Sequence, residues 1–261
     1  MKFAISICIS LLVFGVVAAS NSQSALLGLA GAWSFDEGSG EEIRDSVGNN
    51  HGEIVGDLKW VDGRFGKALE FAGAGDSYVT IPHHDSMDSD PYTITAWVRL
   101  EPVSWQYIAW KNGLTWPEPH ALRHIDIWVS DGSNIVVVMW AFEGGGANYG
   151  RIDGATAVAD GTWHHVAKSA DEGTMRLFID GKLDGEAPTG GDLVVNGEDP
   201  LWIGARPGDV AATGIIDEVG FFTEALSEDD LAEVMNNSLE ILAPVEPRSK
   251  LATTWGEFKA N

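Results

Sequence analysis

Short runs of alternating apolar and polar residues, each closed by a turn signal, recur along most of the chain. They occupy residues 31–35, 67–71, 77–81, 92–100, 106–111, 123–129, 134–141, 162–169, 174–179, 200–204 and 215–222. Dipeptides such as Asp160-Gly161 and Asp180-Gly181 separate them, and we expect the second at the tip of a hairpin. Many short strands with turns between them are typical of an antiparallel sandwich.

The 261 residues are enough for one large all-β domain, which we place at residues 28–240. A single short C-terminal helix is expected, because Ser227 can cap it and Asp230 stands three residues further on. Residues 241–261 are expected to form a proline-containing linker and a short tail that cannot fold alone.

The N-terminus has the features of an export signal. Lys2 precedes a nearly apolar run over residues 3–17, and small residues follow at positions 17–20. We expect residues 1–20 to be removed, residues 21–27 to form a polar spacer, and the mature chain to be secreted or periplasmic without a membrane span. An uncleaved anchor and a buried first helix are the alternatives.

Cysteine content and charge exclude several functions. Cys8 is the only cysteine and lies in the expected signal, so thiolate catalysis and cysteine-based zinc sites are excluded. The formal charge of −23 opposes binding to nucleic acid or anionic membranes and favours solubility and cation binding. A solvated acidic surface explains most of these charges.

Several segments, taken in order, resemble the laminin-G-like or pentraxin-like domains of secreted bacterial proteins, which have the concanavalin A-like jelly-roll fold. The resemblance covers roughly residues 28–240, and the order and spacing of its segments are more specific than any one of them. The segments are 31–40 (GAWSFDEGSG), 66–71 (GKALEF), 77–82 (SYVTIP), 92–98 (YTITAWV), 163–167 (WHHVA), 177–182 (LFIDGK), 215–219 (IIDEV) and 225–227 (ALS). It implies two stacked antiparallel sheets, frequent calcium binding, and recognition of carbohydrate or protein.

Strand alternation predicts a ligand-binding patch. In the runs 93–100, 106–111 and 123–129, one face is apolar and the other mixes aromatic with polar side chains. If the three strands are neighbours, the second faces form one patch, and sugars are bound by such aromatic and hydrogen-bonding groups. A solvated outer face, or burial beneath a loop, is the alternative. The patch consists of Trp97, Arg99, Tyr107, Lys111, His124, Asp126 and Trp128.

A calcium site is the second candidate, because calcium prefers several carboxylate and carbonyl oxygens. Asp36 and Glu37 follow the first strand, and Asp76 lies in a glycine-rich turn. Asp217 interrupts an apolar final strand, where a buried charge needs a partner. In related sandwiches, an acid of the last strand and an acid after the first strand share one metal. The alternative is that Asp217 accepts backbone hydrogen bonds or pairs with an arginine.

Enzyme signatures are weak. Jelly-roll glycoside hydrolases place their acids on alternate residues of one strand, so that two carboxyl groups flank the scissile bond. The nearest segment, residues 124–131, has His124 at the first acid position and no acid at 128 or 129. His164 and His165 are adjacent on a strand, so their rings point to opposite faces.

The sequence therefore predicts a secreted, non-catalytic, calcium-stabilised recognition module that binds an extracellular glycan. A protein-interaction or adhesion domain that binds a cell-surface protein is the first alternative, and a glycan-processing enzyme is the second.

Overall fold

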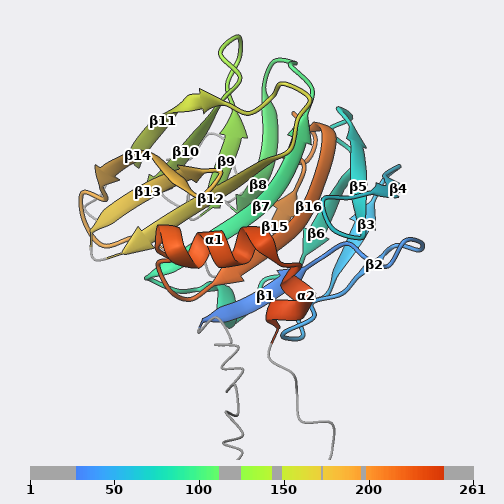
Figure 1. Cartoon of the computed structure of the whole chain (residues 1–261), viewed down its shortest axis with the longest axis horizontal. Coiled ribbons are helices and arrows are strands. Elements are labelled where there is room, and N and C mark those ends of the chain that lie inside the picture. Colours follow the sequence, from blue (N-terminus) through green and yellow to red (C-terminus); the bar gives the residue numbers. More distant parts are fainter. Residues whose placement is uncertain (1–27, 112–124, 143–148, 172, 195–197, 244–261) are drawn as a thin grey trace, which may run out of the picture.

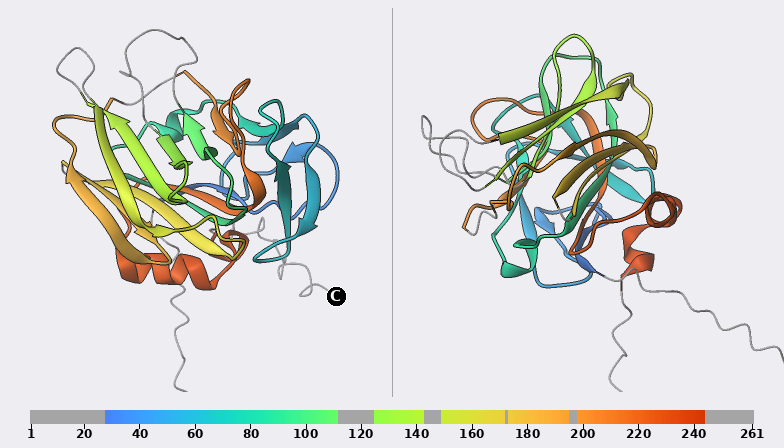
Figure 2. Two further views of the ribbon diagram at one scale, coloured as in Figure 1. Left: turned by 90° about the horizontal axis from the view of Figure 1, so that it is seen from above. Right: turned by 90° about the vertical axis from the view of Figure 1, so that its left-hand side faces the viewer.

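The computed structural model describes residues 28–111, 125–142, 149–171, 173–194 and 198–243. Within these ranges two antiparallel sheets are stacked face to face, as Figures 1 and 2 show. The predicted all-β two-sheet sandwich is confirmed. The expected signal peptide and most of the expected tail lie outside the described residues.

Sheet A carries the final strand at its centre, so that both ends of the domain meet there. In spatial order it contains β14 (Lys182–Pro188), β13 (Thr174–Ile179), β12 (His164–Asp171), β7 (Tyr92–Leu100), β16 (Thr213–Phe222), β5 (Lys67–Ala72) and β4 (Lys59–Asp62). The first strand, β1 (Leu29–Trp33), also pairs with β16.

Sheet B covers the other side of the core. In spatial order it contains β11 (Tyr149–Ala157), β10 (Ile135–Ala141), β9 (Ile125–Val129), β8 (Gln106–Lys111), β15 (Leu201–Ile203), β6 (Tyr78–Ile81), β3 (Gly52–Val55) and β2 (Glu42–Ile43). The edge strands of the two sheets, namely β2, β4, β11 and β14, were not predicted, and neither was β3, which lies next to the edge. They mix exposed and half-buried positions, so their alternation is weak.

The core between the sheets is aliphatic and aromatic, because alternate residues of each strand point inward. Trp33, Phe71 and Trp140 are among its largest fully buried side chains. Lys168 of β12 is fully buried as well, and its Nζ donates a hydrogen bond of 2.8 Å to the carbonyl of Met139 in sheet B. The buried ammonium therefore links the two sheets and satisfies a backbone acceptor.

The predicted hairpin tip is confirmed: β13 ends at Ile179, β14 begins at Lys182, and the two residues between them have positive φ. Asp180 has φ 51° and Gly181 has φ 73°, the conformation that a two-residue hairpin turn requires.

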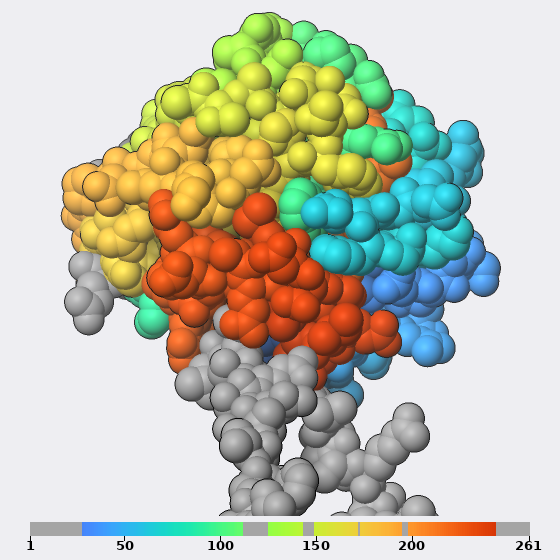
Figure 3. Space-filling model, in the orientation of Figure 1, coloured from blue at the N-terminus to red at the C-terminus, as the bar shows by residue number. Residues whose placement is uncertain are grey.

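Helices cover part of the outer face of sheet A, and strand residues remain visible beside them (Figure 3). The predicted helix is α1 (Glu228–Asn236), and Ser227 and Asp230 form its capping box. A second short helix, α2 (Leu239–Leu242), was not predicted and crosses the expected boundary at residue 240. Leu231, Val234 and Leu239 pack on this face. Within the described part of the chain, neither helix has the length and apolar character needed to cross a membrane.

Candidate functional site

The outer face of sheet B carries a second apolar cluster, separated from the core by the sheet itself. We name it the aromatic layer. It consists of Tyr107, Trp110, Trp128, Val137, Met139 and Trp202, all at most 9% exposed. Its rings are in mutual contact: Trp110 stacks on Trp202 at 5.0 Å between centroids and meets Tyr107 edge-on at 6.3 Å. Outer sheet faces are usually polar, whereas the side chains of this apolar face are almost completely buried, as in the alternative in which the face is covered.

A β-bulge in β8 builds half of this layer. Tyr107 lies opposite Trp128, but Ala109 lies opposite Ile127, so the register shifts between them. Ile108 and Ala109 consequently both face the core, and Trp110 faces outward beside Tyr107. Simple alternation places Trp110 on the core face with Ile108, and that expectation is wrong because of the extra residue.

Trp105 packs against the outer side of the aromatic layer and, unlike the members of the layer, has an exposed ring. It stacks on Trp128 with centroids 4.7 Å apart and planes 7° apart, yet it remains 47% exposed. Its φ is 49°, a conformation that costs energy for a bulky residue. The strained backbone and the parallel stack together present one indole ring to solvent in a fixed orientation.

Two arginines border the layer. The guanidinium of Arg151 lies 5.3 Å from the ring centroid of Trp128, and that of Arg206 lies 5.4 Å from the ring centroid of Trp110. Such cation–π contacts contribute about 0.5–1 kcal/mol at exposed positions. Among the described residues, this face thus presents the exposed indole of Trp105 and the guanidinium groups of Arg151 and Arg206, which are planar hydrogen-bond donors.

The predicted ligand patch is divided between the two sheets. Trp97 and Arg99 belong to β7, which pairs with β12 and β16 in sheet A, so the expectation that β7 is a neighbour of β8 is wrong. Tyr107 and Trp128 do come together, in the aromatic layer. Alternation identifies the two faces of a strand but not the sheet to which the strand belongs. His124 lies outside the described residues.

Trp97 and Arg99 point outward from sheet A. Trp97 is 5% exposed, with the guanidinium of Arg64 at 4.5 Å from its ring centroid and His165 edge-on at 5.3 Å. Arg99 is exposed, and its guanidinium lies 5.5 Å from the ring centroid of Trp163. Trp97 therefore packs beneath other residues of sheet A's surface, away from Trp128.

Lys111 and Asp126 are both fully buried. The bulge turns Lys111 to the side of core residue Ile125, where its Nζ donates a hydrogen bond of 2.9 Å to the carbonyl of Asp199. Asp126 lies opposite Trp110, beneath the exposed surface. Of the predicted patch, Asp126 thus shares the outer face with Trp110 and Trp128 but is covered, whereas Lys111 lies on the core side.

Asp217 occupies a well-defined hydrogen-bonding position. Its Oδ2 accepts from the backbone N–H groups of Arg64 at 2.7 Å and Phe65 at 3.2 Å, and its Oδ1 accepts from that of Glu218 at 2.9 Å. Burial raises the pKa of Asp217 to about 8, assisted by the charge of Glu218 and opposed by these amides. The arrangement matches the alternative in which Asp217 binds backbone amides.

The other predicted calcium ligands have separate hydrogen-bond partners. Asp36 Oδ1 accepts from the Lys67 N–H at 2.6 Å, and Glu37 Oε1 accepts from the Arg44 N–H at 2.8 Å. Asp76 lies 3.4 Å from the hydroxyl of its neighbour Ser77. These residues and Asp217 are not brought together as one coordination shell among the described residues. The calcium prediction therefore does not fit this set as a single site, and it stays a prediction.

Two buried oxygens near the first and last strands lack a hydrogen-bond partner in the described structure, namely Glu37 Oε2 and Glu218 Oε1. Glu218 follows Asp217 at a bulge in β16, with φ 49°. Its Oε2 accepts from the Leu239 N–H at 2.7 Å and so anchors α2. Burial raises the pKa of Glu218 to about 7, with a smaller contribution from the charge of Asp36.

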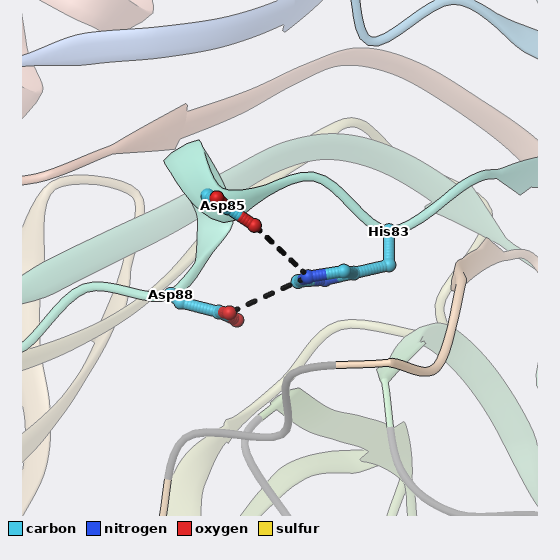
Figure 4. A group of neighbouring side chains, drawn as sticks. All are labelled: His83, Asp85 and Asp88. Carbon is cyan, nitrogen blue, oxygen red and sulfur yellow. Dashed lines mark ion pairs between the residues drawn. The ribbon is translucent and has the colours of Figure 1, made fainter.

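One group with metal-ligand atoms does come together among the described residues: His83, Asp85 and Asp88, after β6 and around the 3₁₀ turn Asp85–Met87 (Figure 4). His83 Nε2 lies 3.6 Å from Asp85 and 3.4 Å from Asp88. On the other side of the ring, His83 Nδ1 lies 3.3 Å from the buried Nζ of Lys111. The Lys111 ammonium, so close to His83, opposes the binding of a metal cation. His83, Asp85 and Asp88 are therefore better suited to interacting with Lys111 and with one another than to holding a metal.

Sequence reasoning missed Trp105, Trp202, Arg151 and Arg206. Trp105 was missed because it lies in a loop, where alternation has no meaning. Arg151 lies in β11, whose glycines conceal the alternation. The unusual number of tryptophans, 11, was the available signal, since it left room for an aromatic surface.

This fold and its aromatic outer face define a lectin-like sandwich. The family model described as the concanavalin A-like lectin/glucanases superfamily matches residues 73–232, more than half of the chain, and the chain belongs to this family. No curated protein matches the chain.

Solved structures similar in fold include a domain of an arabinanase and the binding domains of several toxins. Domain 4 of AbnA, an extracellular GH43 arabinanase from Geobacillus stearothermophilus solved with arabinotriose, has 22% identity and a TM-score of 0.60, with 80% of this chain and 98% of that chain covered. The binding domain of Paraclostridial Mosquitocidal Protein 1 has 15% identity, a TM-score of 0.62, and coverage of 80% and 52%.

Botulinum neurotoxin type C, whose cell entry depends upon interaction with two ganglioside molecules, has 13% identity, a TM-score of 0.61, and coverage of 80% and 51%. The chain spans about half the length of the two toxin chains. At these identities the likeness establishes the fold alone.

Proposed function

We propose that this protein is an exported, non-catalytic module that binds carbohydrate on the outer face of sheet B. The observation that carries the proposal is Trp105, a ring 47% exposed yet fixed by its stack on Trp128. A sugar ring can stack its C–H face on such an indole with little loss of conformational freedom. The complex of domain 4 of AbnA with arabinotriose supports the same class of ligand.

The experiment is a binding comparison of the wild type with Trp105→Ala on a panel of soluble polysaccharides, by affinity electrophoresis and titration calorimetry. We expect Trp105→Ala to weaken binding at least tenfold, because stacking of a nucleobase on one aromatic ring is worth about 1–3 kcal/mol and we expect a comparable value for a sugar ring. Val103→Ala is the control, since Val103 is an exposed apolar residue of the same loop. Equal binding by both variants would remove the aromatic layer from the proposal and favour the protein-binding alternative.

The acids of this face support a non-catalytic role. Asp153 and Asp209 are ion-paired with arginines, and Asp126 is fully buried. Glycoside hydrolysis requires two carboxyl groups free to act on either side of the bond. Release of reducing sugar from any polysaccharide that the protein binds would contradict this part of the proposal.

Export and calcium complete the proposal. Export is supported by the signal-like N-terminus, and N-terminal sequencing of secreted protein should find a start near residue 21.

Calcium is supported by the buried, unpartnered Glu37 Oε2 and Glu218 Oε1, since carboxylate oxygens are the usual ligands of this ion. Equal melting temperatures in calcium and in chelator would remove calcium from the proposal.

A further inference from the structure

The cations beside the aromatic layer are not free to bind an anion. Arg151 Nε donates to both carboxylate oxygens of Asp153, at 3.1 and 2.9 Å, and Nη2 donates to Oδ1 as well. Arg206 Nη1 lies 3.4 Å from Asp209 Oδ2. Each guanidinium that lies over an indole of the layer therefore has its own aspartate beside it.

These aspartates face the solvent from which a ligand would arrive. The side chains of Asp153 and Asp209 are 49% and 53% exposed, slightly more than those of Arg151 and Arg206 at 44% and 36%. An anionic sugar that approached either guanidinium would come close to a carboxylate. The carboxylate and the anionic sugar carry like charges, so the aspartate opposes this approach.

The charge of the whole chain acts in the same direction. The formal charge is −23, so the field around the protein repels anions at long range. Recognition of a carboxylate or sulfate normally uses an arginine whose fork is open to the ligand. Here Asp153 accepts hydrogen bonds from the guanidinium of Arg151, and Asp209 forms a single ion pair with Arg206. Neutral hydroxyl groups can still accept from the remaining N–H groups and donate to the exposed carboxylate oxygens.

We infer that the aromatic layer selects an uncharged glycan and rejects acidic ones, with the Arg151–Asp153 pair as the selective element beside the stacking ring of Trp105. This inference rests on the proposed function, and it assigns that site a class of ligand. Asp153 has the specific role of neutralising Arg151 toward an acidic ligand while it offers acceptors to hydroxyl groups.

The test compares uncharged oligosaccharides (xylohexaose, cellohexaose and arabinotriose) with acidic ones (hexagalacturonate, 3′-sialyllactose and a heparin hexasaccharide). Calorimetric titrations are made at 50 and 500 mM NaCl. We expect at least one uncharged oligosaccharide to bind in a manner that Trp105→Ala abolishes, with an affinity that changes less than about twofold between the two salt concentrations. The acidic oligosaccharides should bind at least tenfold more weakly.

Asp153→Asn is the decisive variant, because it leaves Arg151 in place and removes the charge that neutralises it. We expect it to tighten hexagalacturonate binding at least fivefold at 50 mM NaCl and to lose most of that gain at 500 mM. Asp57→Asn is the matched control, since Asp57 is exposed between β3 and β4 and its loss changes the net charge by the same amount. It should leave hexagalacturonate binding within twofold of the wild type.

Three outcomes of these titrations are contrary to expectation. If an acidic oligosaccharide binds the wild type as well as the uncharged ones, and Trp105→Ala abolishes that binding, the neutral-ligand inference is overturned and the proposed function stands. If Asp153→Asn and Asp57→Asn have equal effects, the Arg151–Asp153 pair is not the selective element and the inference is likewise overturned. Absence of Trp105-dependent binding to every member of the panel overturns the proposed function and this inference together.

Discussion

Asp217 and Arg64, which lie far apart in the sequence, are joined by a hydrogen bond of 2.7 Å from the Arg64 backbone N–H to Asp217 Oδ2. Phe65 donates to the same oxygen. The turn before β5 is thereby fastened to the central strand of sheet A, and the Arg64 side chain is placed over Trp97.

The Asp217→Ala protein should be destabilised by about 3 kcal/mol, because several buried backbone donors lose their acceptor at once. If the carboxylate acts through these amides, the loss in melting temperature is the same in calcium and in chelator. Differential scanning calorimetry in both buffers measures it, with Asp57→Asn as a control of unchanged stability. A loss confined to the calcium buffer would identify Asp217 as a metal ligand after all.

Trp105→Gly and Trp105→Ala should separate backbone strain from recognition. Both remove the exposed ring and should bind glycan equally poorly. Glycine adopts φ near 49° without penalty, so Trp105→Gly should be more stable than Trp105→Ala, by about 1 kcal/mol. Urea unfolding gives the difference. If the alanine variant is the more stable of the two, Trp105 is not held in a strained conformation.

Lys111→Met is expected to reduce stability and leave glycan affinity unchanged. The ammonium is fully buried, bonded to the Asp199 carbonyl and adjacent to His83, so its removal leaves partly buried polar groups without this partner, at about 1 kcal/mol. Affinity is calculated per folded molecule, from titrations well below the melting temperature. A tenfold weaker affinity with normal melting would place Lys111 in the binding site.

His165→Phe should make stability less sensitive to acid. Burial lowers the pKa of His165 to about 4, from about 6.5 in the unfolded chain. A depressed folded pKa gives stability that is complete above pH 6.5 and is lost as the pH falls from 6.5 towards 4, by up to about 1.4 kcal/mol per pH unit.

The measurement is the difference in unfolding free energy between the wild type and His165→Phe at pH 7, 6 and 5. The unfolding free energy of the wild type should fall relative to that of His165→Phe as the pH falls. The raised pKa values of Asp217 and Glu218 act in the opposite direction, lowering stability as pH rises, but they are common to both proteins and cancel in the difference. Parallel profiles would mean that His165 does not titrate between these values.

The sequence predicts local structure well where a residue type has one specific role, such as a helix cap or a tight turn. Ser227 and Asp230 predict the start of a helix, and Asp180-Gly181 predicts a tight turn. The sequence does not reveal which strands become neighbours. Trp97 and Trp128 have the same alternation with aliphatic residues, yet they are found on different sheets. Strand pairing is decided by contacts between distant segments, which periodicity does not record.

Only some residues of the candidate site were therefore predicted from the sequence. Tyr107 and Trp128 were expected on one face, and they are in contact there. Trp110 was assigned to the opposite face because a bulge cannot be read from alternation. Trp105 was missed because its position depends on a loop conformation and a stacking partner from another strand.

The bulge in β8 has a consequence for how this surface changes during evolution. Loss of either Ile108 or Ala109 would restore regular alternation and leave one inward residue between Tyr107 and Trp110, so that both aromatic rings stay on the outer face and Lys111 stays on the core side. The aromatic face would therefore survive a single codon deletion at the bulge, which removes only one inward side chain. Relatives with one residue fewer at this point of the strand would then keep the same outer surface.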